Sequence, residues 1–584
     1  MEVDTDAVAT TDEKTRRLAQ VPVLRQVLTG LDAFEVAALE DGVLWYGVPG
    51  GTTLFEQGEH ERDVFVLLDG RLGVFVDKGL GRRLVHHSVP GEFIGEMALI
   101  SNEPRTATVV ALRDSEVLRI PAALADRLLA PSPPFMAFLL GQFSARLKTM
   151  TIGETRPMGV ESVAVVPIGD DPIDDAAADE IARAFRALGG DVIVVDQRDA
   201  ETGTLAAAGA LRVDIARDRR VVWATRAIRQ ADRVLFVATA GSRPDSPAVA
   251  ELAALARRTK PTDIMLVNPA GNAHAAGGRL WLGHFAPDQI FHVARGDAAD
   301  HRRVARLVTG RAVGLVLAGG GARGFAHIGA MRALAEAGIS ADLICGTSMG
   351  ALVGGTAAYD VDLDEVKRKV HDSFVLNRPI GDYTLPLVSL ARGRRMSALF
   401  AKHFGDADIV DCWRTFFCVS TNLSTAKAQI HREGPLRRAL RASSSLPGIV
   451  PPLVEGNDVL VDGGLMNNFP VDLMAALSRG RVIGIDIAAG TVFRADEPEI
   501  EARSLAWMLG PGRHKVPNIL KLLMRSGLVA SEPRCESNRR LADLLVRPDL
   551  GTIDLLSFNR YEEAIAAGYH GTLAALEALP VPFV

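Results

Sequence analysis

The order of apolar and polar positions divides the chain into regions of different periodicity. From about Leu44 to Ile120, short alternating runs are separated by glycines, a pattern typical of a small β-barrel or roll. In this region Asp69 and Gly70 stand between two apolar runs and predict a hairpin turn. From Ser162, four continuous apolar runs alternate with helical stretches, and they read SVAVVPI, DVIVVD, RVLFVA and DIMLVN. Such runs are typical of the buried strands of a parallel sheet.

A second α/β segment begins at Val313, where the strand VGLVLAGGG runs into a glycine-rich loop. A helix is predicted for GFAHIGAMRALAEAG, ending at Gly338, and strands are predicted for DLICG, DVLVD and RVIGID. The expected fold class is multidomain α/β, with an N-terminal β-roll carrying helices, a middle parallel α/β segment and a C-terminal α/β part. The expected domain boundaries are 1–150, 160–300, 313–478 and 479–584, the last being an extension packed on the third domain.

Composition agrees with a folded globular chain, because 48% of the 584 residues are apolar and 23% are charged. The net charge of 65 − 71 = −6 argues against a protein whose main partner is nucleic acid. The four cysteines form no CxxC pair, which argues against a disulfide framework and suits a reducing compartment.

No targeting or membrane-spanning segment is predicted. The N-terminal stretch MEVDTDAVATTDEKTRR is acidic and polar, where a secretory signal is basic and then apolar. The uncharged run between Asp342 and Asp360 is short for a membrane span and contains a glycine-rich turn, so we interpret it as a buried strand, turn and helix. We therefore expect a cytoplasmic protein that is at most peripheral on the inner face of a membrane.

The segment Gly346-Thr347-Ser348-Met349-Gly350 matches the G-x-S-x-G pattern of a serine nucleophile. Such a serine must sit on a sharp turn between a strand and a helix, and the flanking glycines let the chain turn without Cβ clashes. Here the motif follows the apolar strand DLICG and precedes a helical run. It predicts Ser348 as the nucleophile and Gly346 and Gly350 as parts of the elbow. A glycine-rich packing turn is the alternative.

The upstream loop Gly319-Gly320-Gly321-Ala322-Arg323-Gly324 also follows a strand and opens a helix. Its backbone N–H groups can bind a phosphate or the oxyanion of an acyl-transfer intermediate. Gly319, Gly321 and Gly324 also match the dinucleotide pattern G-x-G-x-x-G. That fold needs an acidic residue at the end of the second strand, whereas Asp342 lies at its start. The dinucleotide interpretation is therefore disfavoured.

The residue that activates Ser348 is predicted to be Asp462, in VLVDGGLMNNFP. It ends an apolar strand, and the two glycines after it permit a close approach. An aspartate has an ordinary pKa near 3.9, but burial raises that pKa and a direct bond to the serine hydroxyl would let it accept the proton. A solvated hairpin turn is one alternative. Another is a histidine base, for which the downstream candidates are His371, His403, His431, His514 and His570.

The motifs GGGARG (319–324), GTSMG (346–350) and DGG (462–464), in this order, resemble those of the patatin-like phospholipase family. The likeness covers about 313–478. It implies a serine esterase with a Ser348–Asp462 dyad that uses no metal and no catalytic cofactor, and a structural role for His327. The segment SSSLPGIVPP (443–452) resembles a family segment that we attribute to packing. The oxyanion hole implied by the resemblance is Gly319, Gly320, Gly321, Arg323 and Gly324.

A glutamate and an arginine stand close together late in the roll, in GEMALI (95–100) and PRTAT (104–108). A helix beginning near Glu96 offers N–H groups to a phosphate, Arg105 can pair with that phosphate bidentately, and Glu96 can accept a hydrogen bond from a ribose hydroxyl. With LFEQG (54–58) and the hairpin expected at Asp69 and Gly70, these residues resemble the cyclic-nucleotide-binding domain, over about 24–148. A structural Glu–Arg pair in a roll that has lost binding is the alternative. The site implied is Gly95, Glu96, Met97, Ala98, Arg105 and Thr106.

The roll, the middle α/β part and the patatin-like part, in this order, resemble the neuropathy target esterase family over most of the chain. The resemblance implies hydrolysis of the acyl esters of phospholipids or lysophospholipids at a peripheral membrane surface. It also implies a cyclic nucleotide as regulatory ligand, with cAMP favoured over cGMP on family grounds. A non-catalytic, cyclic-nucleotide-sensing scaffold at a membrane is the alternative. In the tail, KVPNILKLLMRSG (515–527) suits an interfacial helix, although core packing is favoured.

Overall fold

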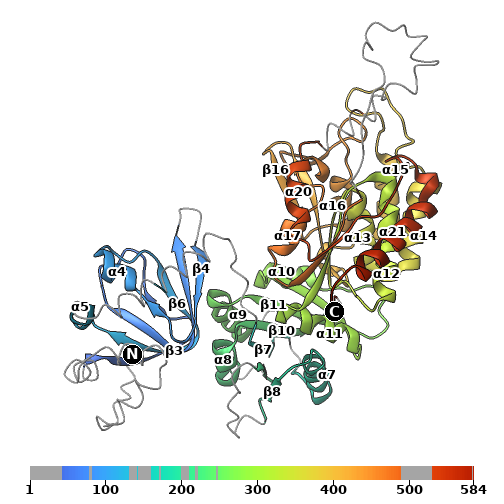
Figure 1. Cartoon of the computed structure of the whole chain (residues 1–584). Helices are drawn as coiled ribbons and strands as arrows, with labels where there is room; N and C mark the ends of the chain where they lie inside the picture. Colours follow the sequence, from blue (N-terminus) through green and yellow to red (C-terminus); the bar gives the residue numbers. More distant parts are fainter. Residues whose placement is uncertain are drawn as a thin grey trace, which may run out of the picture. The chain divides into compact units, whose positions relative to one another are not determined.

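The three-dimensional structure is a computed structural model (Figure 1). The residues it describes are 42–77, 82–129, 141, 160–169, 172–198, 210–217, 221–244, 247–487, 522, 529–581 and 583. The chain divides into two units. The first comprises 1–178, 189–236 and 244–263, and the second comprises 179–188, 237–243 and 264–584. The segment predicted as an interfacial helix (515–527) lies outside the described residues, apart from Leu522.

The predicted N-terminal roll is a six-stranded antiparallel sheet whose path runs β1-β6-β3-β4, with β2 paired to β6 and β5 to β3. Its inner face is closed by aliphatic and aromatic side chains from nearly every strand, including Phe55, Leu67, Leu72 and Val117. Its strands are β1 (Leu44–Val48), β2 (Thr53–Phe55), β3 (Val64–Asp77), β4 (Arg82–Ser88), β5 (Phe93–Ile94) and β6 (Thr108–Ile120), and its helices are α4 (Glu96–Ser101) and α5 (Ala122–Leu129).

The hairpin predicted at Asp69 and Gly70 is wrong, because β3 continues through both residues as one strand. The strand β6 pairs with β3 on both sides of this point, and the register shifts there. Gly70 has φ +98°, and a Cβ at this position would clash with Ser115 of β6. The dipeptide therefore forms a bulge in a long paired strand, where glycine supplies the left-handed conformation.

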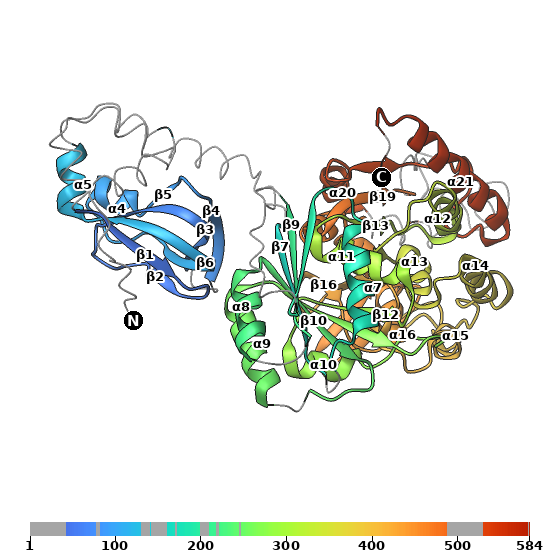
Figure 2. The same ribbon diagram turned by 90° about the horizontal axis from the view of Figure 1, so that it is seen from below.

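The middle sheet has the order β12-β11-β10-β7-β9-β8, and β9 pairs in parallel with both β7 and β8. The four apolar runs seen in the sequence are β7, β8, β10 and β11, while β9 and β12 were not predicted. Helices α8 and α9 lie side by side along one face of the sheet (Figure 2). The strands are β7 (Ser162–Pro167), β8 (Val192–Asp196), β9 (Leu211–Ile215), β10 (Arg233–Thr239), β11 (Thr262–Asn268) and β12 (Gln289–Ala294), and the helices are α7 (Asp175–Arg186), α8 (Val221–Gln230), α9 (Pro247–Thr259), α10 (Gly278–Phe285) and α11 (Ala298–Thr309).

The third sheet has the order β17-β18-β15-β14-β13-β19-β20, with β16 paired to β15. Its centre is parallel, and β16, β17 and β18 add an antiparallel edge. The multidomain α/β fold class is thereby confirmed. The strands are β13 (Ala312–Leu317), β14 (Leu343–Thr347), β15 (Thr415–Asn422), β16 (Lys427–His431), β17 (Leu453–Glu455), β18 (Asp458–Asp462), β19 (Gly480–Ile485) and β20 (Leu544–Val546).

Helices cover this sheet, and the last of them packs closely on the first (Figures 1 and 2). A Cβ at Gly329 would clash with the Ile565 carbonyl, and one at Gly568 would clash with the Ala326 carbonyl, so α12 and α21 cross in near backbone contact. None of the helices in the described part of the chain combines the length and apolar character needed to cross a membrane. The helices are η2 (Gly321–Phe325), α12 (Ala326–Glu336), α13 (Met349–Asp360), α14 (Leu363–His371), η3 (Asp372–Leu376), α15 (Arg394–Phe404), η4 (Ile409–Asp411), α16 (Leu436–Ser443), η5 (Gly463–Leu465), α17 (Val471–Ala475), α20 (Glu532–Arg539), η8 (Phe558–Arg560) and α21 (Tyr561–Glu577).

Candidate active site and nucleotide pocket

Ser348 occupies the sharp turn that the G-x-S-x-G pattern predicts. Strand β14 ends at the residue before it and α13 begins at the residue after it. Its backbone has φ +54° and ψ −120°, a conformation that is strained for a residue with a side chain. A Cβ at Gly346 would clash with the backbone of Gly350, and one at Gly350 would clash with the Leu317 carbonyl. Only glycine fits on either side of the serine, as a nucleophile elbow requires.

The Ser348 hydroxyl donates a hydrogen bond to the Asp462 carboxylate. The Oγ lies 2.6 Å from Oδ2, and the other carboxylate oxygen, Oδ1, accepts the Gly464 amide at 2.8 Å. Asp462 is 1% exposed. Burial raises its pKa from 3.8 to about 6, against the opposing effect of the bonds from Ser348 and Gly464. The carboxylate is therefore ionised at neutral pH and a better proton acceptor than an ordinary aspartate.

Serine and aspartate meet because β14 and β18 flank the same strand, β15. Thr347, next to the serine, pairs with Val419, and Asp462 pairs with Ser420, one position further along β15. The turn after the aspartate then folds tightly over β15, since a Cβ at Gly463 would clash with the Val419 carbonyl. The GTSMG and DGG motifs, more than a hundred residues apart, are thus brought together because their strands pair with adjacent residues of β15.

A third side chain bonds the elbow, in a role that the motifs of the sequence do not reveal. Ser443, the buried last residue of α16, accepts a hydrogen bond from the Ser348 amide at 2.9 Å and donates one to the Val419 carbonyl at 2.7 Å. The segment 443–452 was attributed to packing alone. Its run of three serines at a helix end was the available signal, because buried hydroxyls there must find partners.

The glycine-rich loop lies beside the serine, since a Cβ at Gly319 would come within 3.2 Å of the Ser348 Cβ. The Gly319 amide donates to the Asn468 carbonyl at 3.1 Å, and the Asn468 side-chain amide donates back to the Gly319 carbonyl at 3.1 Å. This reciprocal pair anchors the start of the loop. At its other end, Gly324 packs so closely on Met349 that a Cβ would clash with that side chain.

Two further residues of the loop, Ala322 and Arg323, have backbone amides that already donate to carbonyls of the protein. The Arg323 amide donates to the Gly320 carbonyl at 3.2 Å, and its guanidinium donates to the Ile553 carbonyl at 2.8 Å. The Ala322 amide donates to the Leu555 carbonyl at 2.8 Å. Among the described residues, the amides of Gly320 and Gly321 have no hydrogen-bond acceptor. These two amides can therefore serve an oxyanion, whereas Gly319 and Arg323 hold the loop in place.

None of the candidate histidines that the structure describes is hydrogen-bonded to Ser348. His431 bonds the Ser420 hydroxyl at 2.7 Å, and the rings of His371 and His570 pack against tyrosines. His403 lies 3.2 Å from the Asp372 carboxylate, and His514 lies outside the described residues. His327, assigned a structural role, is buried beside the loop, where it bonds the Ala318 carbonyl at 2.9 Å and burial lowers its pKa to about 4.

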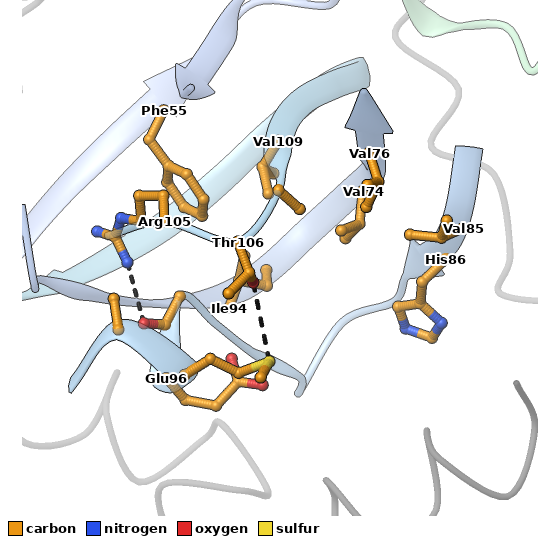
Figure 3. Close-up of a pocket in the computed structure, with 14 residues that line it drawn as sticks. Phe55, Val74, Val76, Val85, His86, Ile94, Glu96, Arg105, Thr106 and Val109 are labelled. Carbon is orange, nitrogen blue, oxygen red and sulfur yellow. Dashed lines mark hydrogen bonds between the residues drawn. The ribbon is translucent and has the colours of Figure 1, made fainter. Parts of the chain in front are cut away.

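A pocket of about 280 Å³ opens in the roll, and all six residues of the predicted nucleotide site line it (Figure 3). Helix α4 begins at Glu96, as predicted, and Glu96 is buried in the pocket wall. The Thr106 hydroxyl is exposed and faces the Met97 sulfur at 3.9 Å. The lining residues are Phe55, Val74, Val76, Val85, His86, Ile94, Gly95, Glu96, Met97, Ala98, Arg105, Thr106, Ala107 and Val109.

Arg105 is a buried cation in the wall of this pocket, 3% exposed. Its guanidinium donates to the carbonyls of Gly95 at 2.9 Å and Asp63 at 2.7 Å, and it lies 4.0 Å from the centre of the Phe55 ring. Burial lowers its pKa from the ordinary value. The Nε atom is buried without a hydrogen-bond partner among the described residues. A buried guanidinium whose acceptors are two neutral carbonyls and whose Nε lacks one fits an anionic ligand.

Two family models match parts of this chain. Residues 315–475 match the model of the patatin-like phospholipase family, and residues 47–132 match that of the cyclic nucleotide-binding domain. An NTE family protein of Mycobacterium bovis is 30% identical over 98% of this chain and 97% of its own length. A protein of Mycosarcoma maydis named as a lysophospholipase is 26% identical over 92% of this chain, which corresponds to 34% of that protein. A solved structure of the regulatory domain of Toxoplasma gondii PKA with cAMP matches 24% of this chain and 54% of its own, with 22% identity and a TM-score of 0.21.

The fold and the matches define a lipid ester hydrolase of the patatin-like phospholipase class that carries an N-terminal cyclic nucleotide-binding domain. The Mycobacterium bovis relative is 30% identical and aligns over nearly the whole of both chains. The chain therefore belongs to the NTE family.

Proposed function

We propose that this chain hydrolyses the acyl ester bonds of phospholipids or lysophospholipids through a Ser348–Asp462 dyad. The observation that carries the proposal is the 2.6 Å contact between the hydroxyl of an elbow serine and a buried carboxylate whose pKa burial raises to about 6. A patatin-like phospholipase model matches this region, and a relative is named as a lysophospholipase.

The geometry supports a two-step acyl transfer. The Ser348 oxygen attacks the ester carbonyl carbon while its proton passes to Asp462 Oδ2. The amides of Gly320 and Gly321 donate to the oxyanion that forms. When the intermediate collapses, the C–O bond breaks and the leaving alcohol takes the proton from Asp462. Water then attacks the acyl-enzyme with Asp462 as base, which releases the fatty acid and restores the serine.

Replacement of the nucleophile tests this proposal. Ser348→Ala should lose ester hydrolysis by about 10³-fold or more and should not be labelled by a fluorophosphonate, because no covalent intermediate can form. The assay uses a short-chain nitrophenyl ester and a lysophospholipid side by side, and circular dichroism checks that the variant folds. Labelling that persists in Ser348→Ala would overturn the assignment. Wild-type protein inactive on both substrates would favour a non-catalytic scaffold.

We further propose that the roll binds a cyclic nucleotide, with Arg105 bonding the phosphate and Glu96 accepting from the ribose hydroxyl. The cyclic nucleotide-binding model, the pocket and the unpartnered Arg105 Nε support this proposal. We favour cAMP, and titration calorimetry with cAMP and cGMP tests the choice. Heat from neither nucleotide would mean that the roll has lost binding.

Regulation of hydrolysis by the nucleotide is a separate part of the proposal. A ligand can change the activity only if it favours one of two states of the esterase. We therefore expect a change in lysophospholipid hydrolysis at saturating cAMP that Arg105→Ala abolishes. If binding is observed but neither hydrolysis nor vesicle binding changes, the roll is only a binding module.

A further inference from the structure

The segment between η3 and α15 forms a well-defined projection from the esterase unit. Tyr383 and Ala391 form an antiparallel bridge, and the Thr384 amide donates to the Leu390 carbonyl at 3.0 Å. At its base, the Asp382 carboxylate accepts the backbone amides of Gly393 at 3.3 Å and Arg395 at 3.2 Å. The segment is thus a closed, hydrogen-bonded loop with its tip near Leu387.

Large apolar side chains crowd the tip of this loop and face solvent. Leu387 is 90% exposed, Leu385 is 78%, Tyr383 is 76% and Val388 is 69%. Single exposed apolar residues are normal on a protein surface, but four within six positions on one projection mark an interaction site. We call these four residues the apolar tip.

A group of arginines surrounds the base of the loop. Arg392, Arg394 and Arg395 are exposed, as is Arg378 before the loop. Among the described residues none of these four arginines forms an ion pair, and the nearby Asp382 carboxylate is engaged by backbone amides. This loop is complementary to the surface of an anionic bilayer. The apolar tip matches the acyl chains in the interior, and the unpaired arginines at the base match the phosphate groups at the surface.

The loop is connected to the segment that holds the dyad. The amides of Leu390 and Ala391 donate to the carbonyls of Gly448 and Ile449, both at 2.9 Å. Three residues before Gly448, the Ser445 carbonyl accepts the Asp462 amide at 2.9 Å. The loop is therefore hydrogen-bonded to the same backbone segment that holds the amide of Asp462.

We propose that the apolar tip inserts into the surface of an anionic phospholipid bilayer and that Arg378, Arg392, Arg394 and Arg395 bind the lipid phosphates. The use of that bilayer as a source of substrate rests on the function proposed above. The docking itself needs no catalysis, so the two ideas can fail separately.

Co-sedimentation of the full chain with vesicles tests the docking. Vesicles of phosphatidylcholine and phosphatidylglycerol should bind the wild type and Ser348→Ala equally, and should bind better than phosphatidylcholine alone. The double variant Leu385→Asp/Leu387→Asp should bind at least tenfold more weakly, and Arg394→Glu/Arg395→Glu should lose the preference for the anionic lipid. Val222→Asp, an equally exposed apolar position in the other unit at 85%, is the matched control and should bind like wild type.

Activity measurements separate docking from chemistry. Leu385→Asp/Leu387→Asp should hydrolyse a soluble short-chain nitrophenyl ester at the wild-type rate but release fatty acid from vesicles at least tenfold more slowly. Unchanged vesicle binding in this variant would overturn the proposal. So would a wild-type dimer in sedimentation velocity that the variant converts to a monomer, because the tip would then contact a second copy. Vesicle binding through the tip by a wild type inactive on every ester would sink the proposed hydrolysis and leave the docking intact.

Discussion

The catalytic site and the nucleotide pocket differ in how much of their hydrogen bonding the protein completes by itself. At the proposed catalytic site the Ser348 hydroxyl already donates to the Asp462 carboxylate, and both carboxylate oxygens have donors. In the roll, Arg105 is held by two backbone carbonyls, and its Nε has no acceptor among the described residues. The proposed dyad is therefore assembled without a substrate, whereas the proposed phosphate ligand would have to complete the bonding of Arg105 or replace its internal bonds.

This difference has a consequence for energetics. Asp462 is destabilised as an anion by burial, and that penalty is what makes it a base near neutral pH. Arg105 keeps its charge because its ordinary pKa is so high that burial cannot neutralise it at physiological pH. The proposed function of the first site therefore depends on the raised pKa of Asp462. That of the second depends on the Arg105 guanidinium, whose hydrogen bonding is incomplete.

The largest expected effect is that of Asp462→Asn. The change leaves a group of the same shape that cannot take the proton, so we expect kcat/KM to fall by about 10²- to 10⁴-fold. In the wild type the base works as the carboxylate, so kcat/KM should rise about tenfold per pH unit up to about pH 6 and then level off. A pH–rate profile with the nitrophenyl ester measures both quantities.

The stability of the folded protein should fall over the pH range in which kcat/KM rises. The folded pKa of Asp462 is raised from 3.8 to about 6, so the folded protein holds a proton that the unfolded chain releases between these values. Stability therefore falls as the pH rises through that window, and Asp462→Asn should lack this fall in its Tm. Asp458→Asn, on the same strand, is the control. An active Asp462→Asn beside an inactive His431→Ala would instead indicate a histidine base.

A smaller effect is expected at the other site. Arg105→Ala should weaken cyclic nucleotide binding by about 10- to 100-fold, the loss of a charged hydrogen bond to phosphate. Hydrolysis without nucleotide should stay at the wild-type rate. Arg62→Ala is the control, since Arg62 lies in the same roll but bonds Leu99 and Asp126 outside the pocket lining. Equal affinities of wild type and Arg105→Ala would show that Arg105 is only a packing cation.

The elements of the catalytic site that the sequence predicted are those encoded by local backbone demands. Gly346 and Gly350 flank a strained serine, and the turn after Asp462 needs glycine to pass over β15, so these motifs are visible in the chain. Asp69 and Gly70 show the limit of this reasoning. A glycine after an aspartate marks a bulge there and not a hairpin turn, because the partner strand β6 extends past the glycine. The dipeptide alone does not determine which distant strand will pair with it.

The sequence also could not reveal the roles of residues whose hydrogen-bond partners lie far along the chain. Gly319 and Arg323 belong to the loop predicted to hold the oxyanion, but the Gly319 amide donates to the Asn468 carbonyl and the Arg323 guanidinium to the Ile553 carbonyl, both far along the chain. Strands β9 and β12 are as long as β8 and β7, but polar side chains interrupt their apolar runs, namely Arg212, Asp214 and His292, so the sequence did not reveal them. The domain boundaries stay predictions, and so do the catalytic and nucleotide-binding roles of the site residues.

The smallest expected effect is that of Ser443→Ala, which asks how far the catalytic site depends on its preassembled hydrogen bonds. The change removes the acceptor of the Ser348 amide and the donor to the Val419 carbonyl, so the strained elbow loses the side chain that holds the Ser348 backbone. We expect kcat to fall about tenfold with KM nearly unchanged, because a misplaced nucleophile costs rate more than binding. The rate of fluorophosphonate labelling should fall in parallel, while the acid limb near pH 6 should stay, since Asp462 is untouched. Ser444→Ala is a close control, because that neighbouring hydroxyl bonds the Leu440 carbonyl of α16 and, among the described residues, has no bond to the elbow. If both variants lose activity equally, or if KM rises while kcat holds, Ser443 packs the helix end and does not position the nucleophile.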